Sequence, residues 1–315
     1  MRAWEFTGTH EPFVRVELPD PKPRREEVVI AVKAAGICHS DVSIFEDEQW
    51  LVLVEVSVVP GHEIVGVIES VDAGVSNYAE GERVAVWPMP PDAHSSGFSR
   101  DSGFAEKVAA GVEMLIPIPD DVPADFAAAA TDARVTSHRT VIGAGEVTAG
   151  MKVSIIGFGG PGQIGGRVAV LKGAEAYVAE VKREIWPRAS EVGAGRAVEH
   201  AMELADEQLD VIVDSARLGT TTTGAIEAIR PAGRVLQIGM SALEATIKTV
   251  SLIAKRVQLI GSLGGGLEGT ESDLRSISSG DLSPTVEHTD FARVAPRIRR
   301  FKLNDVSGRL VAEYA

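Results

Sequence analysis

Residues 153–180 read VSIIGFGGPGQIGGRVAVLKGAEAYVAE, and this stretch decides the fold. Gly157, Gly159 and Gly162 stand in G-x-G-x-x-G spacing directly after an apolar run typical of a buried strand. A helical segment follows, and then a second apolar run that ends at Glu180. The first glycine permits a tight turn, the second lets a pyrophosphate approach the backbone, and the third lets the helix pack on the strand. We therefore predict a dinucleotide-binding unit here rather than an ordinary glycine-rich turn.

The same stretch bears on the choice of cofactor. Gly160 lies inside the glycine turn and is a further candidate for cofactor contact, at a helix N-terminus that attracts phosphate groups. Glu180 is placed to accept hydrogen bonds from the adenosine ribose hydroxyls, which favours NAD over NADP. Lys182 and Arg183 could instead meet a 2′-phosphate, or could be solvated residues at a helix start.

The rest of the chain has two different patterns. From residue 151 to about 263, apolar runs of four to six residues alternate with helical segments, which predicts a parallel sheet covered on both faces. The first 120 residues contain short β-branched runs between Pro, Gly and Asp, and they predict a β-rich part. Residues 89–103, MPPDAHSSGFSRDSG, form the one long polar loop. The fold class expected is α/β.

Composition narrows the function. A chain of 315 residues is long enough for two domains. Its 31 basic and 45 acidic residues give a net charge of −14, which disfavours nucleic acid and anionic membrane surfaces as partners. The single cysteine cannot form an internal disulfide. We expect neither a signal peptide nor a membrane span, and therefore a cytoplasmic protein.

That single cysteine, Cys38, lies in GICHSD, residues 36–41. His62 follows in PGHEIVG, and Asp132 in TDARVT. Thiolate, imidazole and carboxylate all bind zinc, and three protein ligands leave a fourth position open for chemistry. A buried cysteine that packs as a small hydrophobic residue and a structural Gly-His-Glu turn are the alternatives.

In this order, GICHSD, GHEIVG, TDARVT and GFGGPG match motifs of a known family over essentially the whole chain. The sequence resembles the zinc-dependent alcohol dehydrogenases of the medium-chain dehydrogenase/reductase family. The resemblance implies a GroES-like catalytic domain, residues 1–132 and 264–315, and a Rossmann cofactor domain, residues 133–263. It also implies hydride transfer between a small-molecule alcohol, aldehyde or ketone and NAD, with NADP less favoured, and a homodimer or homotetramer.

The resemblance also assigns roles to single residues. Cys38, His62 and Asp132 match the ligands of the catalytic zinc. Ser40 matches the hydroxyl that contacts the substrate oxygen and starts a proton relay. Asp41 matches the carboxylate that steadies the histidine ligand.

Further roles concern the zinc and the cofactor. Glu63 matches an acid that transiently binds zinc. His39 and Arg309 match pyrophosphate contacts, and Thr136 matches a residue packed against nicotinamide. Phe45, Trp50 and Trp87 resemble pocket-lining aromatics, although ordinary core packing explains them equally well.

The chain also departs from the family. It has no cysteines for a second, structural zinc, so one zinc ion per chain is expected. Ser43 stands where many relatives have a relay histidine, and Asp72 and Arg134 replace glycines. Two alternatives remain: a zinc-independent NAD(P)H quinone or enone reductase of the same fold, and a non-catalytic nucleotide-binding protein.

Overall fold

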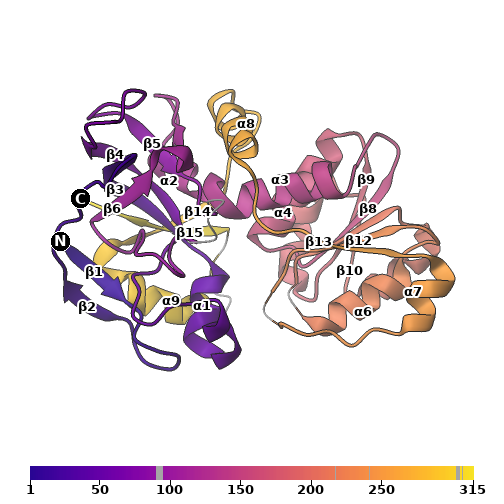
Figure 1. The fold of residues 1–315 in the computed structure, drawn as a ribbon. Coiled ribbons are helices and arrows are strands. Elements are labelled where there is room, and N and C mark those ends of the chain that lie inside the picture. Colours follow the sequence, from indigo (N-terminus) through magenta and orange to yellow (C-terminus); the bar gives the residue numbers. More distant parts are fainter. Residues whose placement is uncertain (90–94, 217, 241, 303–305, 307) are drawn as a thin grey trace. The chain divides into compact units, whose positions relative to one another are not determined.

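A computed structural model describes residues 1–89, 95–216, 218–240, 242–302, 306 and 308–315 (Figure 1). The chain forms two compact units. The first comprises Met1–Ala133 and Gly266–Ala315, and the second comprises Arg134–Gly265. Across the described part of the chain, no helix has the length and apolar character needed to cross a bilayer.

The first unit is built on a largely antiparallel sheet in the order β14-β15-β3-β4-β5-β7, with β6 also paired to β3. Its strands are β3 (Glu27–Ile37), β4 (Glu63–Val71), β5 (Arg83–Val86), β6 (Lys107–Gly111), β7 (Leu115–Pro117), β14 (Val286–Asp290) and β15 (Arg309–Glu313). A separate hairpin pairs β1 (Arg2–Glu5) with β2 (Val14–Glu17). The β-rich part that the sequence predicts is thereby confirmed.

Helices flank this sheet. They are α1 (His39–Glu46), η1 (Glu48–Val52), η2 (Val112–Met114), α2 (Ala124–Ala129), α8 (Leu267–Ser278), η7 (Phe291–Arg293) and α9 (Val294–Lys302). A large apolar core contains Ile30, Ile37, Ile64 and Phe104, all essentially inaccessible to solvent. The long strand β3 is buried along most of its length, and its end delivers Cys38 to the start of α1.

The second unit is a six-stranded parallel sheet in the order β10-β9-β8-β11-β12-β13. Its strands are β8 (Lys152–Ile156), β9 (Glu175–Ala179), β10 (Arg196–Val198), β11 (Val211–Asp214), β12 (Arg234–Gln237) and β13 (Gln258–Gly261). Numbered from β8, this is the 3-2-1-4-5-6 order of dinucleotide-binding sheets. The predicted parallel sheet is confirmed.

Helices cover both faces of this sheet. They are α3 (Val135–Arg139), η4 (Thr140–Ala144), α4 (Gly160–Leu171), η5 (Arg183–Ile185), α5 (Trp186–Glu191), η6 (Ala201–Glu207), α6 (Gly219–Ala228) and α7 (Thr249–Lys255). Successive residues of β8 point to opposite faces, so Ile155 enters the core that contains Val168 of α4, and Ile156 enters the core that contains Ile226 of α6.

Candidate active site

Cys38 is held where β3 passes into α1. It is the N-cap residue of α1, and its backbone N–H donates a 2.7 Å hydrogen bond to Oδ2 of Asp41. Asp41 occupies the third position of the helix, where a carboxylate caps the free N–H groups and complements the helix dipole. The second oxygen of Asp41 lies 3.6 Å from Nδ1 of His62. One buried carboxylate therefore contacts two of the expected zinc ligands.

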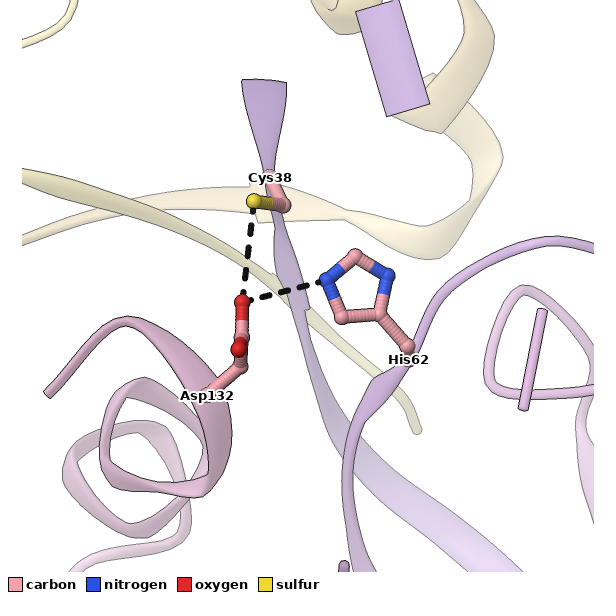
Figure 2. A group of neighbouring side chains, drawn as sticks. All are labelled: Cys38, His62 and Asp132. Atoms are coloured by element: carbon pink, nitrogen blue, oxygen red, sulfur yellow. Dashed lines mark hydrogen bonds and ion pairs between the residues drawn. The ribbon is translucent and has the colours of Figure 1, made fainter. Parts of the chain in front are cut away.

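His62 enters the site from a turn that precedes β4. Gly61, just before it, has φ +91°, a conformation that other residues adopt only with strain. The ring is 5 % exposed. With Nδ1 facing Asp41, Nε2 points to Asp132 at 3.3 Å (Figure 2). The contact with Asp41 thus selects the nitrogen that is presented to the centre of the cluster.

Asp132 lies in a short π-helical turn, η3 (Ala130–Arg134), between α2 and α3. π-helical turns insert one residue into a helix and often occur at functional sites. Its Oδ2 is 3.8 Å from Sγ of Cys38, and the ligand atoms of Cys38, His62 and Asp132 all lie within 4.8 Å of one another. Residues separated by 94 positions in the sequence therefore converge.

The spacing of these atoms fits zinc. With zinc bonds of about 2.0–2.3 Å, a tetrahedron places its ligand atoms roughly 3.3–3.6 Å apart. Oδ2 of Asp132 lies 3.3 Å from Nε2 of His62 and 3.8 Å from Sγ of Cys38, close to that range. A set of one sulfur, one nitrogen and one oxygen donor leaves one corner of the tetrahedron for another ligand.

The charges of the cluster also suit a dication. Burial raises the pKa of the Cys38 thiol, but the positive charge of Arg309 and the contact with His62 outweigh burial and bring that pKa to about 6. Burial lowers the pKa of His62, whereas the negative charge of Asp41 and the contact with Asp132 raise it well above its usual value. A zinc ion would replace the proton on His62 as the positive charge among these anions.

Glu63 and Arg309 form a buried ion pair beside this cluster. Nε of Arg309 donates a 2.7 Å hydrogen bond to Glu63, and Nη2 donates to the other carboxylate oxygen. Burial raises the pKa of Glu63, Arg309 lowers it, and the charges of Asp132 and Cys38 raise it again, so that it stays above its usual value. Both residues thus lie in the electrostatic neighbourhood of the ligands, and Arg309, expected at a pyrophosphate, donates two of its N–H groups to Glu63.

The glycine turn of the second unit has the geometry that its sequence predicts. Gly157 has φ +80°, and a Cβ on Gly162 would overlap the carbonyl oxygen of Gly157. A Cβ on Gly159 would meet no atom within 4 Å, so its surface is open. Gly160 is the first residue of α4, whose N-terminal N–H groups face this open turn. The turn is thus closely packed where Gly162 meets Gly157, and its backbone is accessible at Gly159.

Glu180 lies just beyond β9, and the residue is 8 % exposed. It accepts hydrogen bonds from the backbone N–H of Phe158 at 2.7 Å and of Lys182 at 2.9 Å. Arg183 pairs with Glu199 at 3.0 Å. The acid is therefore fixed against the glycine turn by two backbone amides.

The remaining predicted residues occupy varied positions. His39 and Ser40 form the first turn of α1 and are half-buried, and Thr136 is half-buried in α3. The hydroxyl of Ser43 donates to the backbone oxygen of His39 at 3.1 Å, which satisfies it within the helix. Arg134 is only 1 % exposed.

The expected aromatic residues and Asp72 complete this set. Trp50 is 4 % exposed and belongs to the apolar core, whereas Phe45 and Trp87 are half-buried and pack against the cores. Asp72 closes a turn by accepting a 3.1 Å hydrogen bond from the N–H of Gly74. Residues 90–94 of the predicted polar loop lie outside the described residues.

Comparison with known proteins decides the family. Residues 24–120 match the model of the alcohol dehydrogenase GroES-like domain, and residues 160–279 match that of the zinc-binding dehydrogenases. The chain belongs to the zinc-type alcohol dehydrogenases of the medium-chain dehydrogenase/reductase family. The β-rich part is accordingly the family's GroES-like domain, and the parallel sheet is its Rossmann domain.

Individual members of this family resemble the chain along its whole length. An alcohol dehydrogenase of Geobacillus stearothermophilus is 26 % identical over 99 % of both chains. A probable cinnamyl alcohol dehydrogenase of Eucalyptus gunnii is 25 % identical over 91 % of this chain and 88 % of its own. The structure of acetophenone reductase from Geotrichum candidum in complex with NAD has a TM-score of 0.92 and 25 % identity, and covers 99 % of this chain and 97 % of its own.

Two residues beside the site were missed from the sequence. Gly36 pairs with Glu63 across the sheet, and a Cβ on Gly36 would overlap the Glu63 carboxylate. A glycine inside a strand often marks such a close approach, so this signal was present. Phe98 packs against the ring of His62, and nothing in the polar loop around it indicates that contact.

Proposed function

We propose that this protein catalyses reversible hydride transfer between an alcohol and the corresponding aldehyde or ketone, with a nicotinamide cofactor and one zinc ion per chain. The observation that carries the proposal is the convergence of Cys38, His62 and Asp132, whose ligand atoms lie within 4.8 Å of one another. The relatives named for alcohol, cinnamyl alcohol and acetophenone support small-molecule alcohols and carbonyl compounds as substrates.

Zinc held by these three residues would supply a Lewis acid for the substrate oxygen. The nicotinamide would supply or accept the hydride. Asp41 keeps the ring of His62 oriented, and Ser40, in the same helical turn, is the hydroxyl proposed to exchange a proton with the substrate oxygen. Ser43 is a poor continuation of that relay because its own proton is donated to the backbone of His39.

Turnover and metal content together test this proposal. Purified protein should hold about one zinc per chain and should oxidise NADH with members of a panel of aldehydes and ketones. Removal of zinc by a chelator should abolish turnover, and added zinc should restore it. Turnover of quinones or enones by metal-free protein would favour the zinc-independent reductase, and the absence of any turnover with bound NADH would favour a non-catalytic protein.

We further propose NAD as the preferred cofactor. Glu180 uses one lone pair on each oxygen for backbone amides, which leaves acceptor capacity for two ribose hydroxyls. A 2′-phosphate would be repelled by this carboxylate. Arg183 is engaged by Glu199 and lies over the ring of Trp186 at 5.5 Å, so it is poorly placed to offset that repulsion.

The ratio of kcat/KM for NADH and NADPH tests the cofactor preference. NADH should be preferred, and Glu180→Ala should narrow the difference by admitting the 2′-phosphate. Glu191→Ala is a matched control, since it removes an exposed carboxylate of α5 and leaves both Glu180 and the pair of Arg183 with Glu199 in place. A preference of the unsubstituted protein for NADPH would contradict the proposal.

We also propose that two chains pair through β13. This strand is last in the order of its sheet and is mostly exposed, so that its outer backbone groups are open to a partner strand. Segments that flank β13 in the sequence also carry exposed apolar side chains: Val250 and Ile253 on α7 are 69 % and 73 % exposed, and Leu263 is 60 % exposed. Sedimentation of the protein should show a dimer or tetramer. The N–H groups of Gln258 and Ser262 face β12, and N–H groups alternate sides along a strand, so Leu259→Pro removes a donor from the outer side of β13 and should shift the protein toward monomer. A monomeric unsubstituted protein would contradict this proposal.

A further inference from the structure

Phe98 lies in the polar loop of residues 89–103, a segment that the proposed reaction does not use. Its ring centroid is 5.5 Å from that of His62, and the two ring planes are inclined by 38°. This separation is within the range of about 4.5–7 Å over which aromatic rings attract one another. Phe98 is half-buried and also contacts the main core of the first unit. The ring of the proposed zinc ligand His62 thus packs against an aromatic side chain from a loop.

The loop is bound to the turn that carries His62. Three backbone N–H groups, those of Ser102, Gly103 and Phe104, donate hydrogen bonds of 2.7–2.9 Å to backbone oxygens in the segment Val59–Gly61. In return, the N–H of Val59 donates a 2.9 Å hydrogen bond to Asp101. These bonds fix the backbone on the N-terminal side of the histidine.

Close packing adds to these hydrogen bonds. A Cβ on Gly97 would lie 2.9 Å from the nitrogen of Gly61, and a Cβ on Gly61 would lie 2.5 Å from the ring of Phe104. Neither glycine can take a side chain without moving the two segments apart. On the other flank, the backbone oxygen of Phe98 accepts a 2.8 Å hydrogen bond from the N–H of Glu55. Phe98 is therefore anchored by its own backbone as well as by its ring.

The contacts at the two ring nitrogens of His62 leave the tilt of the ring to be controlled by the segment that carries Phe98. Asp132 and Asp41 lie at the two ring nitrogens, at 3.3 and 3.6 Å. Both contacts are made at the edge of the ring through its nitrogens, and at 3.6 Å the one with Asp41 is too long for a direct hydrogen bond, so they resist tilting of the ring only weakly. A neighbouring ring that packs against the imidazole limits that tilting by its bulk, and Phe98 is such a neighbour.

We propose that residues Gly97–Phe104 form a positioning element for His62, in which Phe98 sets the tilt of the imidazole and so the geometry of the zinc site. The inference rests on the zinc site of the proposed function. Phe98 acts through His62 and touches neither metal nor substrate in this role. Residues that orient a metal ligand typically change metal affinity about 10–100-fold when they are replaced.

The test compares zinc affinity with stability in three variants. Phe98→Leu removes the ring and keeps an apolar side chain, whereas Phe98→Tyr keeps the ring. Leu204→Ala is the control: Leu204 is fully buried in a core of the second unit, whereas the proposed zinc ligands belong to the first. Zinc dissociation constants come from competition with a chelator, Tm from thermal unfolding of the metal-free proteins, and site geometry from the visible spectrum of the cobalt-substituted proteins.

We expect Phe98→Leu to weaken zinc binding about 10-fold and to alter the cobalt spectrum. Phe98→Tyr should bind zinc within about 3-fold of the unsubstituted protein, by the same reasoning. Leu204→Ala should lower Tm without either effect. An unchanged zinc affinity and cobalt spectrum in Phe98→Leu would overturn the inference, and so would an equal loss of affinity in Leu204→Ala. Failure of the unsubstituted protein to bind zinc would instead contradict the zinc site itself and the inference together, whereas zinc binding without turnover would contradict only the proposed reaction.

Discussion

Asp41 combines two tasks that substitution can separate. Its Oδ2 accepts the N–H of Cys38 at 2.7 Å and caps α1, while its Oδ1 faces His62 at 3.6 Å. Asp41→Asn keeps a carbonyl oxygen for the cap but removes the charge that faces the imidazole. Asp41→Ala removes both. We therefore expect the two variants to differ in stability and to agree in their loss of zinc.

The structure sets the magnitudes. Loss of a helix cap lowers the free energy of unfolding by about 1 kcal/mol, which is expected for Asp41→Ala and not for Asp41→Asn. Loss of a group that orients a metal ligand weakens binding about 10–100-fold. Because 3.6 Å exceeds a direct hydrogen bond, the interaction with His62 is chiefly electrostatic, and we expect the lower end, about 10-fold or 1.4 kcal/mol.

Chelator competition measures the zinc affinity, and denaturant unfolding of the metal-free proteins measures the stability. Asp47→Ala is the matched control, because Asp47 caps η1 through the N–H of Gln49 at 2.9 Å and is not part of the zinc cluster. This control should lose stability and keep its zinc affinity. Undiminished zinc affinity in Asp41→Asn would refute the reasoning, since the orienting charge would then be irrelevant.

Three further predictions concern neighbouring residues. In metal-free protein, the rate of alkylation of Cys38 should rise as the pH rises through about 6, the pKa of its thiol. A rate that rises only near pH 8.5, as for a free thiol, would contradict the lowering of this pKa by Arg309 and His62. Asp132→Ala should lose zinc and turnover together, whereas Asp132→Cys should retain zinc; elemental analysis and kcat measure the two effects. Normal zinc content and a normal kcat in Asp132→Ala would show that Asp132 is not a zinc ligand. Gly36→Ala should destabilise the protein by about 3–5 kcal/mol, because the added Cβ forces Glu63 out of its buried ion pair. Gly224→Ala, at a helical position with no atom within 4 Å, is the control and should be neutral or stabilising. Equal free energies of unfolding for the two variants would contradict the packing around Gly36.

The parts of the fold that follow a local pattern could be predicted from the sequence. The turn at Gly157 and the run of alternating strands and helices carry their own signals, because strand and helix periodicity and the glycine spacing are properties of short segments. The segments from β8 to β13 accordingly form the parallel sheet that was expected. Short elements such as β10 (Arg196–Val198) have no comparable signal and were not predicted.

The sequence indicated candidate residues for the site but not how the fold holds them. Family resemblance indicated Cys38, His62 and Asp132, which converge although no local pattern links them. The π-helical turn that presents Asp132 depends on hydrogen-bond register within a helix, which composition does not reveal. The pair of Glu63 with Arg309 joins residues 246 positions apart, and the chemistry of either residue alone did not suggest it.

The central claim is that Cys38, His62 and Asp132 hold one zinc ion. The most direct measurement is an anomalous difference map from crystals of the purified protein, recorded at the zinc absorption edge. We predict one peak per chain, about 2.0–2.3 Å from Sγ of Cys38, Nε2 of His62 and a carboxylate oxygen of Asp132. A zinc-replete protein with no peak between these three residues, or with an equally strong second peak elsewhere in the chain, would contradict the account.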